Sequence, residues 1–273
     1  AQGVDWRGAA LFAVAALSLL YPVIEGRALG WPIWLVAPLA LSVASAGALL
    51  RLQHRRAAVG QPQLLPVTLL GNGRFVTRVA LVTVMFVGIA GPLVILAMVL
   101  QFGLGMSPAR AGNALSAHPL SIMEASVLSG RMGTRHLRRR VSLGLIALLV
   151  GMVGLRALLA ADASLLAIWG PLLLIGAGVG ITTVAMYQLV LREVPHGEAG
   201  AGSGALQAFQ QIGIALGIAL VGQVFFMALG PASSAASYVA AMKAALWVSI
   251  TLFVGLSLIS LKLKTMESAD APT

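Results

Sequence analysis

Apolar stretches separated by short polar segments run along the whole chain, and this pattern predicts its secondary structure. Each stretch is close to, or longer than, the roughly 20 residues that a helix needs to cross the hydrocarbon core of a bilayer. The stretches cover residues 8–24, 31–50, 79–100, 111–129, 141–161, 164–191, 199–228 and 244–261. The sequence therefore predicts an all-α fold, a polytopic membrane helix bundle with about eight transmembrane helices.

The longest polar segment, residues 51–78, separates the first two stretches from the other six. It contains Pro62, Pro66 and the turn-forming pair Asn72-Gly73. Apolar residues at 64–70 predict a short helix lying in the membrane interface. The predicted organisation is a two-helix transmembrane unit at 1–50, a cytoplasmic linker at 51–78, a six-helix unit at 79–264 and a cytoplasmic tail at 265–273.

Composition excludes a water-soluble domain. Of the 273 residues, 59% are hydrophobic and only 10% are charged, and the mean hydropathy is +0.95. The net charge of +10 would point to nucleic acid in a soluble protein, but here the basic residues abut the ends of the apolar stretches. We therefore interpret the basic surplus as a signal of membrane topology and expect the lipid bilayer, with no nucleic acid, as partner.

The placement of the basic residues predicts the orientation. If the chain starts in the cytoplasm, 14 of the 18 lysines and arginines face it. They are Arg7, Arg51, Arg55, Arg56, Arg74, Arg78, Arg131, Arg135, Arg138, Arg139, Arg140, Arg192, Lys262 and Lys264, whereas Arg27, Arg110, Arg156 and Lys243 fall on the other side. This positive-inside asymmetry predicts a plasma-membrane protein with both termini in the cytoplasm.

Motifs for catalysis or metal binding are absent from the sequence. There is no cysteine, and the four histidines include no His-Glu-x-x-His metal motif. Ser203 lacks the flanking glycines of a nucleophile elbow. We expect neither an enzyme nor a bound metal or cofactor.

The six-helix unit shows signs of two three-helix repeats. Transporter halves are commonly built from inverted triplets whose cavity-lining helices are interrupted by glycine and proline. Gly88, Gly91 and Pro92 interrupt the third apolar stretch, and Gly176 and Gly180 interrupt the sixth at corresponding positions. These residues are candidates to line a cavity, and the alternative is that the glycines only allow close helix packing.

Several sequence motifs together resemble the major facilitator superfamily. They are DWRG at 5–8, GMSPARAG at 105–112, GRMGTRHLRR at 130–139, AGAGSG at 199–204 and QQIG at 210–213. The segment at 130–139 is similar to the family's glycine- and arginine-rich cytoplasmic loop, with Thr134 and Leu137 where the family usually has aspartate and glycine. The later motifs resemble the penultimate helix of the fourteen-helix drug:proton antiporters of the EmrB/QacA type, with Gln210 where arginine is frequent.

The resemblance implies the architecture and the activity. The chain corresponds to the extra helix pair of such an antiporter followed by its C-terminal six-helix half, and the N-terminal half is missing. It implies proton-driven efflux of a lipophilic or cationic small molecule, and a cytoplasmic gating loop with Gly130, Arg131, Arg135 and Arg138. A half-protein leaves an alternative open: a transport-incompetent half-transporter, a truncated remnant or a membrane scaffold, needing an N-terminal half or a second copy.

Polar residues inside the apolar stretches are the remaining candidates for chemistry, because an ionisable group in hydrocarbon costs a few kcal/mol. Glu124 lies seven residues before Arg131 on a similar helix face, which predicts either an ion pair or a proton site. Gln207 and Gln211 share one helix face and are candidates to line the cavity or to bond neighbouring helices. His118 is interpreted as a hydrogen-bonded packing residue.

Overall fold

The structure is a computed structural model that describes residues 5–27, 29–231 and 234–269, with side chains as far as residue 260. Within these residues all regular elements are helices. They are α1 (Trp6–Glu25), η1 (Ile33–Leu35), α2 (Val36–Ala58), α3 (Val67–Gly71), α4 (Gly73–Met98), η2 (Val99–Gly103), α5 (Pro108–Arg131), α6 (Leu137–Leu158), α7 (Leu165–Leu191), η3 (His196–Glu198), α8 (Ala199–Leu229) and α9 (Ala235–Ala269). The predicted all-α membrane bundle is confirmed.

Eight long helices match the eight predicted stretches, and seven helical spans in the described part are long and apolar enough to cross a membrane. The helix outside this set is α5, which has 24 residues and is therefore about 36 Å long. Its length suffices, but Asn113, His118, Glu124 and several serines lower its apolarity. Its buried residues, Ala111, Ala114, Ala117, Ser121, Ala125 and Ser129, recur every three or four positions and form one packed face.

The helices extend beyond the apolar stretches because polar residues cap and prolong them. The Asn72 side chain accepts hydrogen bonds from the backbone N–H groups of Arg74 and Phe75, so α4 begins at Gly73, six residues before the predicted span. At the end of α2, Arg55 and Arg56 lie in the last turn, where positive charge favours the helix dipole. The segment between α2 and α4 is consequently shorter than the predicted linker at 51–78.

The six helices of the C-terminal unit interlock. The first helix of each predicted triplet packs against the second and third helices of the other: α4 against α8 and α9, and α7 against α5 and α6. A further contact joins α6 to α9. The elements of the two triplets thus form a common core of buried apolar side chains, including Leu148, Ile175 and Phe253.

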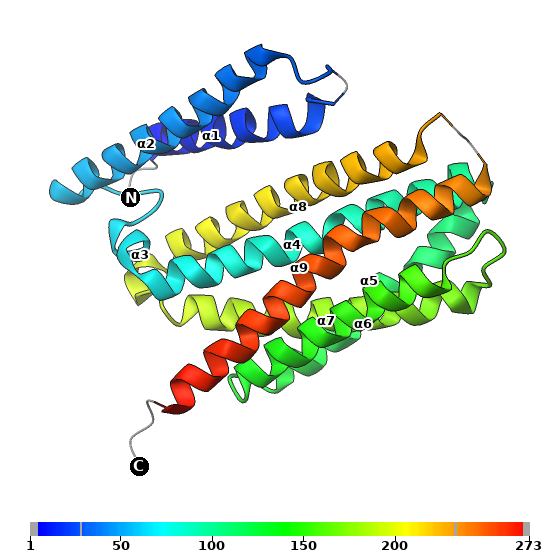
Figure 1. Cartoon of the computed structure of the whole chain (residues 1–273). Helices are drawn as coiled ribbons and strands as arrows, with labels where there is room; N and C mark the ends of the chain where they lie inside the picture. The colour runs from blue at the N-terminus through cyan, green and yellow to red at the C-terminus, as the bar shows by residue number, and fades with distance from the viewer. Residues whose placement is uncertain (1–4, 28, 232–233, 270–273) are drawn as a thin grey trace.

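The two-helix unit stands beside this bundle. Figure 1 shows α1 and α2 as an antiparallel pair along one edge, and α1 contacts α8. The short helix α3 begins at Val67, within the predicted interval 64–70, and ends at Gly71, one residue after it. Its Leu69 and the preceding Leu65 are buried against the core, so these apolar side chains pack against protein.

Candidate functional site

The glycines and the proline predicted to line a cavity lie at helix crossings. A Cβ atom on Gly91 would lie 2.4 Å from the Gly217 carbonyl oxygen of α8, and one on Gly88 would lie 2.8 Å from the Phe253 ring. Pro92 is buried in the same stretch of α4. In the other triplet, a Cβ on Gly176 or Gly180 would meet backbone carbonyls of α5 at 2.4 Å or 2.7 Å. These contacts are close helix packing, while a role in a cavity stays a prediction.

Glu124 lies on the face of α5 that does not contact α7. Its side chain is exposed, as are Met123 and Val127 beside it. Arg131 is exposed at the end of the same helix. Among the described residues, ion pairs join Arg56 to Asp5 and Arg78 to Glu193, but none joins Glu124 to Arg131.

Two glutamines of α8, the predicted cavity candidates, also face away from neighbouring helices. Gln207 and Gln211 are exposed, and Ser203 precedes them at the same four-residue spacing. Gln210, on the adjoining face, is half-buried, and its Oε1 has no hydrogen-bond partner among the described residues. The Nε2 atom of His118 is likewise buried without a partner there.

The turn between α5 and α6 is held by an arginine that the sequence analysis did not single out. Arg140 is 3% exposed and donates hydrogen bonds to the carbonyl of Gly133 at 2.8 Å, to the carbonyl of Ser129 at 2.7 Å and to the Ser129 hydroxyl. The predicted gating-loop residues Gly130, Arg131, Arg135 and Arg138 are exposed around it. Arg140 therefore binds the end of α5 to the start of α6.

The sequence did contain a signal for this role. Leu137, Val141 and Gly144 are the buried residues of the same helix face, and Arg140 falls in their spacing of three and four.

Ionic and hydrogen-bonded contacts tie the other turns at this end together. Arg78 of α4 donates to Glu193 at 2.5 Å and to the carbonyl of Leu189 at 2.5 Å. Thr68 of α3 donates to the Glu198 carboxylate, which precedes α8. The segment between α7 and α8 is thereby anchored to α3 and α4.

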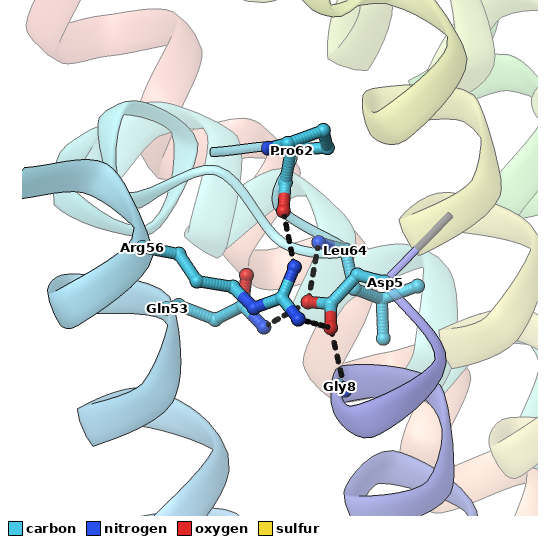
Figure 2. Close-up of polar contacts among 6 residues, drawn as sticks. All are labelled: Asp5, Gly8, Gln53, Arg56, Pro62 and Leu64. Atoms are coloured by element: carbon cyan, nitrogen blue, oxygen red, sulfur yellow. Dashed lines mark hydrogen bonds and ion pairs between the residues drawn. The ribbon is translucent and has the colours of Figure 1, made fainter. Parts of the chain in front are cut away.

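Asp5 organises the most extensive polar cluster in the described chain (Figure 2). It caps α1 by accepting a hydrogen bond from the Gly8 N–H at 2.8 Å, and it also accepts bonds from Gln53 Nε2 at 2.9 Å and from the Leu64 N–H at 3.3 Å. Arg56 lies 3.2 Å from the same carboxylate and donates to the Pro62 carbonyl at 3.0 Å. One buried carboxylate thus joins α1, α2 and the linker.

These contacts lower the pKa of Asp5. Burial by itself raises the pKa of the carboxyl group, but the hydrogen bonds from Gln53, Gly8 and Leu64 and the charge of Arg56 outweigh it, and the net pKa lies below the ordinary value. Asp5 is therefore ionised at neutral pH.

Two cavities lie along the contact between α1 and α8. The first, of about 1100 Å³, is at the linker end and is bounded by Phe12, by residues 60–66 and by the first turns of α8. The second, of about 690 Å³, lies at the other end, where Arg27 donates to the carbonyls of Gln223 and Phe226. Between them, the rings of Phe12 and Phe209 meet edge to face at 6.0 Å. The described residues contain no group of three His, Cys, Asp or Glu side chains that could hold a metal ion.

Comparison with known proteins identifies the family. The model of the Major Facilitator Superfamily matches residues 6–218, which is most of the chain. The chain belongs to the major facilitator superfamily. With its apolar helices, it is an integral membrane protein of this family.

Three curated relatives of this family are similar over most of the chain. It is 30% identical to the "Probable actinorhodin transporter" of Streptomyces coelicolor, with 85% of this chain and 41% of the relative covered. It is 28% identical to the "Tetracycline resistance determinant" of Streptomyces rimosus, covering 83% of the chain and 65% of the relative. It is also 28% identical to "Multidrug resistance protein Stp" of Mycobacterium tuberculosis, covering 82% and 41%. The chain thus spans less than two thirds of the length of these relatives.

Proposed function

We propose that this chain is the C-terminal part of a transmembrane transporter that exports small molecules, with an extra helix pair followed by a six-helix half as in fourteen-helix drug:proton antiporters. The superfamily match and the names of the relatives, which refer to actinorhodin, tetracycline resistance and multidrug resistance, support export of lipophilic or cationic compounds. The proposed site of the complete protein is the plasma membrane, with both termini in the cytoplasm. A transport role, not catalysis, is the function that these observations favour.

The observation that carries this proposal is the exposed carboxylate of Glu124. The opposite face of α5 is packed on α7, whereas Glu124 has exposed apolar neighbours and forms no ion pair with a described residue. An ionised group turned toward lipid costs a few kcal/mol, so this face of α5 requires a polar neighbour or a water-filled pathway. A second transporter half facing α5 supplies both, because alternating access places the pathway between two halves.

Proton coupling is part of the same proposal. Of the two roles predicted for Glu124, an ion pair with Arg131 is not formed, and a protonation site remains. A carboxylate at the boundary of a pathway can take up a proton from one side and release it to the other as access alternates. The proton gradient is the proposed source of energy, and no cofactor is required.

The test is efflux from cells that lack their own drug exporters. Ethidium efflux is measured with the chain expressed by itself, and with the chain joined to an N-terminal half taken from one of its relatives. We expect efflux only from the joined form, and loss of it when a protonophore collapses the gradient. Efflux by the chain as a demonstrable monomer would contradict the two-half arrangement, and efflux insensitive to the protonophore would contradict proton coupling.

A further inference from the structure

Two basic residues meet at the end of the bundle opposite the start of α1. Arg156, in the last turn of α6, donates from Nε to the backbone carbonyl of Lys243 in α9 at 3.2 Å. The Arg156 guanidinium also lies 4.7 Å from the centre of the Trp247 ring. Both basic side chains are half-buried, and this hydrogen bond brings Arg156 of α6 next to the backbone of Lys243 in α9, so the surface formed by the two helices carries two basic residues at this end.

No described carboxylate neutralises this pair. The ion pairs of the described chain are at the opposite end, and Asp162, in the turn after α6, forms none with either residue. The bonds that Arg156 does make, to a carbonyl and to an aromatic face, satisfy part of its guanidinium without cancelling its charge. The site therefore retains two positive charges.

The surroundings of the pair are those of a lipid-facing surface. Val153 and Leu158 of α6 and Val254 of α9 are exposed on the helices that carry it, with exposed fractions of 47%, 51% and 41%. Trp247 is 51% exposed, and tryptophan prefers the level of the lipid headgroups. Lys243 lies about 12 Å along the axis from the first residue of α9, a depth from which a lysine side chain reaches the headgroup region.

We propose that Arg156 and Lys243 form a binding site for the phosphate of an anionic phospholipid. The terminal nitrogens of Arg156 and the ammonium of Lys243 bind the phosphate oxygens, and the acyl chains lie on the apolar surface of α6 and α9. The contact with the Trp247 ring holds the guanidinium in place. An anion of this kind compensates two charges that the protein leaves unpaired, and it fixes α6 against α9 at this end.

Native mass spectrometry of the full chain tests the proposal. The chain is released from detergent with equal amounts of phosphatidylglycerol and phosphatidylcholine, and bound lipid is counted for the wild type, Arg156→Gln, Lys243→Gln and the double variant. Because a basic residue near an anionic surface contributes on the order of 1 kcal/mol, we expect about fivefold weaker phosphatidylglycerol binding for each charge removed. Arg110→Gln, an exposed basic residue at the same end, is the matched control and should bind as the wild type does.

Melting temperatures and competition with inorganic phosphate distinguish loss of the lipid site from loss of the fold. Lys243→Gln retains the backbone carbonyl to which Arg156 donates, so this variant should keep the wild-type melting temperature in phosphatidylcholine. Inorganic phosphate at millimolar concentration should neither displace the lipid nor raise the melting temperature. Equal binding of phosphatidylglycerol by all variants, equal binding of phosphatidylcholine, or full replacement of the lipid by inorganic phosphate would each overturn the site.

Discussion

At the scale of the residue, the environment of each charged group decides its role. Asp5 is buried but fully supplied with donors, and Arg140 is buried but bonded to carbonyls, so both act as structural anchors. Glu124 is exposed and forms no ion pair with a described residue, so nothing in the described chain gives it a structural role. Residues of similar chemistry thus divide into those that hold the fold and Glu124, for which a role in transport is proposed.

Glu124→Gln should separate these roles in an assembled transporter. Because Glu124 makes no ion pair, the amide should change stability by no more than about 0.5 kcal/mol, as at an ordinary surface site. Removal of the titrating group should lower proton-driven efflux and flatten its pH dependence. The measurement is efflux rate against pH beside a melting curve, with Asp162→Asn, an exposed loop carboxylate, as the control. An unchanged pH profile would exclude Glu124 as the proton site.

The Asp5 cluster should make stability depend on pH in one direction. The folded pKa of Asp5 is the lower one, so its contribution is complete above the ordinary carboxyl pKa of about 4 and is lost as the pH falls through the folded pKa. Asp5→Ala should reduce stability by about 1 kcal/mol at neutral pH through loss of the α1 cap, and more through the orphaned Gln53. Asp5→Asn keeps an oxygen that can cap α1 but turns an amide N–H toward other donors. Its stability should lie between those of the wild type and Asp5→Ala.

Melting temperatures of the three proteins at pH 7 and near pH 3 provide the measurement. The difference between wild type and Asp5→Ala should shrink at the lower pH. A difference that is the same at both values would show that the ionised carboxylate contributes nothing.

At the scale of the element, the sequence predicted the positions of the helices better than the contacts between their side chains. Eight apolar stretches located eight long helices because the bilayer fixes the length of a spanning segment. Helix ends were missed where side chains cap them, as at Asn72. The pairing of Glu124 with Arg131 failed because seven residues span about 10 Å of helix axis, beyond the reach of an ion pair.

The element scale also shows why residue type could not distinguish one arginine from its neighbours. Helix α6 begins directly after His136, whose φ of 51° places it in the left-handed region. Three arginines occur in succession at 138–140, and of these only Arg140 lies on the buried face of α6 with Leu137 and Val141. Residue type therefore does not distinguish the three arginines, whereas their position relative to the apolar residues of the same helix face does.

The glycines of α8 at which another helix crosses should be the positions least tolerant of substitution. A Cβ on Gly217 would lie 2.3 Å from the Val87 carbonyl oxygen, so Gly217→Ala must push α8 away from α4 and should cost about 1–3 kcal/mol. Gly204→Ala, in the same helix with no atom within 4 Å, is the control and should be neutral or stabilising by up to about 1 kcal/mol, because alanine favours the helix. Thermal melting in detergent measures both, and equal effects would argue against close packing of α4 on α8.

At the scale of the whole molecule, the ion pairs Arg56–Asp5 and Arg78–Glu193 and the hydrogen bonds of Arg140 lie at the same end of the bundle. The start of α1, the end of α2, the turn from α5 to α6 and the turn from α7 to α8 all lie there, joined through Asp5, Arg140 and Glu193 (Figure 1). Successive long helices run in opposite directions, so every second turn of the chain lies at the same end of the bundle. Basic residues predicted to face the cytoplasm, such as Arg55, Arg135 and Arg192, lie in or next to these turns.

Cysteine labelling should show which side of the membrane this end faces. The native chain has no cysteine, so Arg135→Cys places a single thiol on the exposed turn between α5 and α6. Because positively charged turns are retained in the cytoplasm, we expect an impermeant maleimide to label this variant only after the cells are permeabilised. Ala161→Cys, exposed in the turn between α6 and α7 at the other end, is the matched control and should be labelled in intact cells. The reverse pattern would invert the proposed orientation, and with it place Arg156 and Lys243 in the cytoplasmic leaflet.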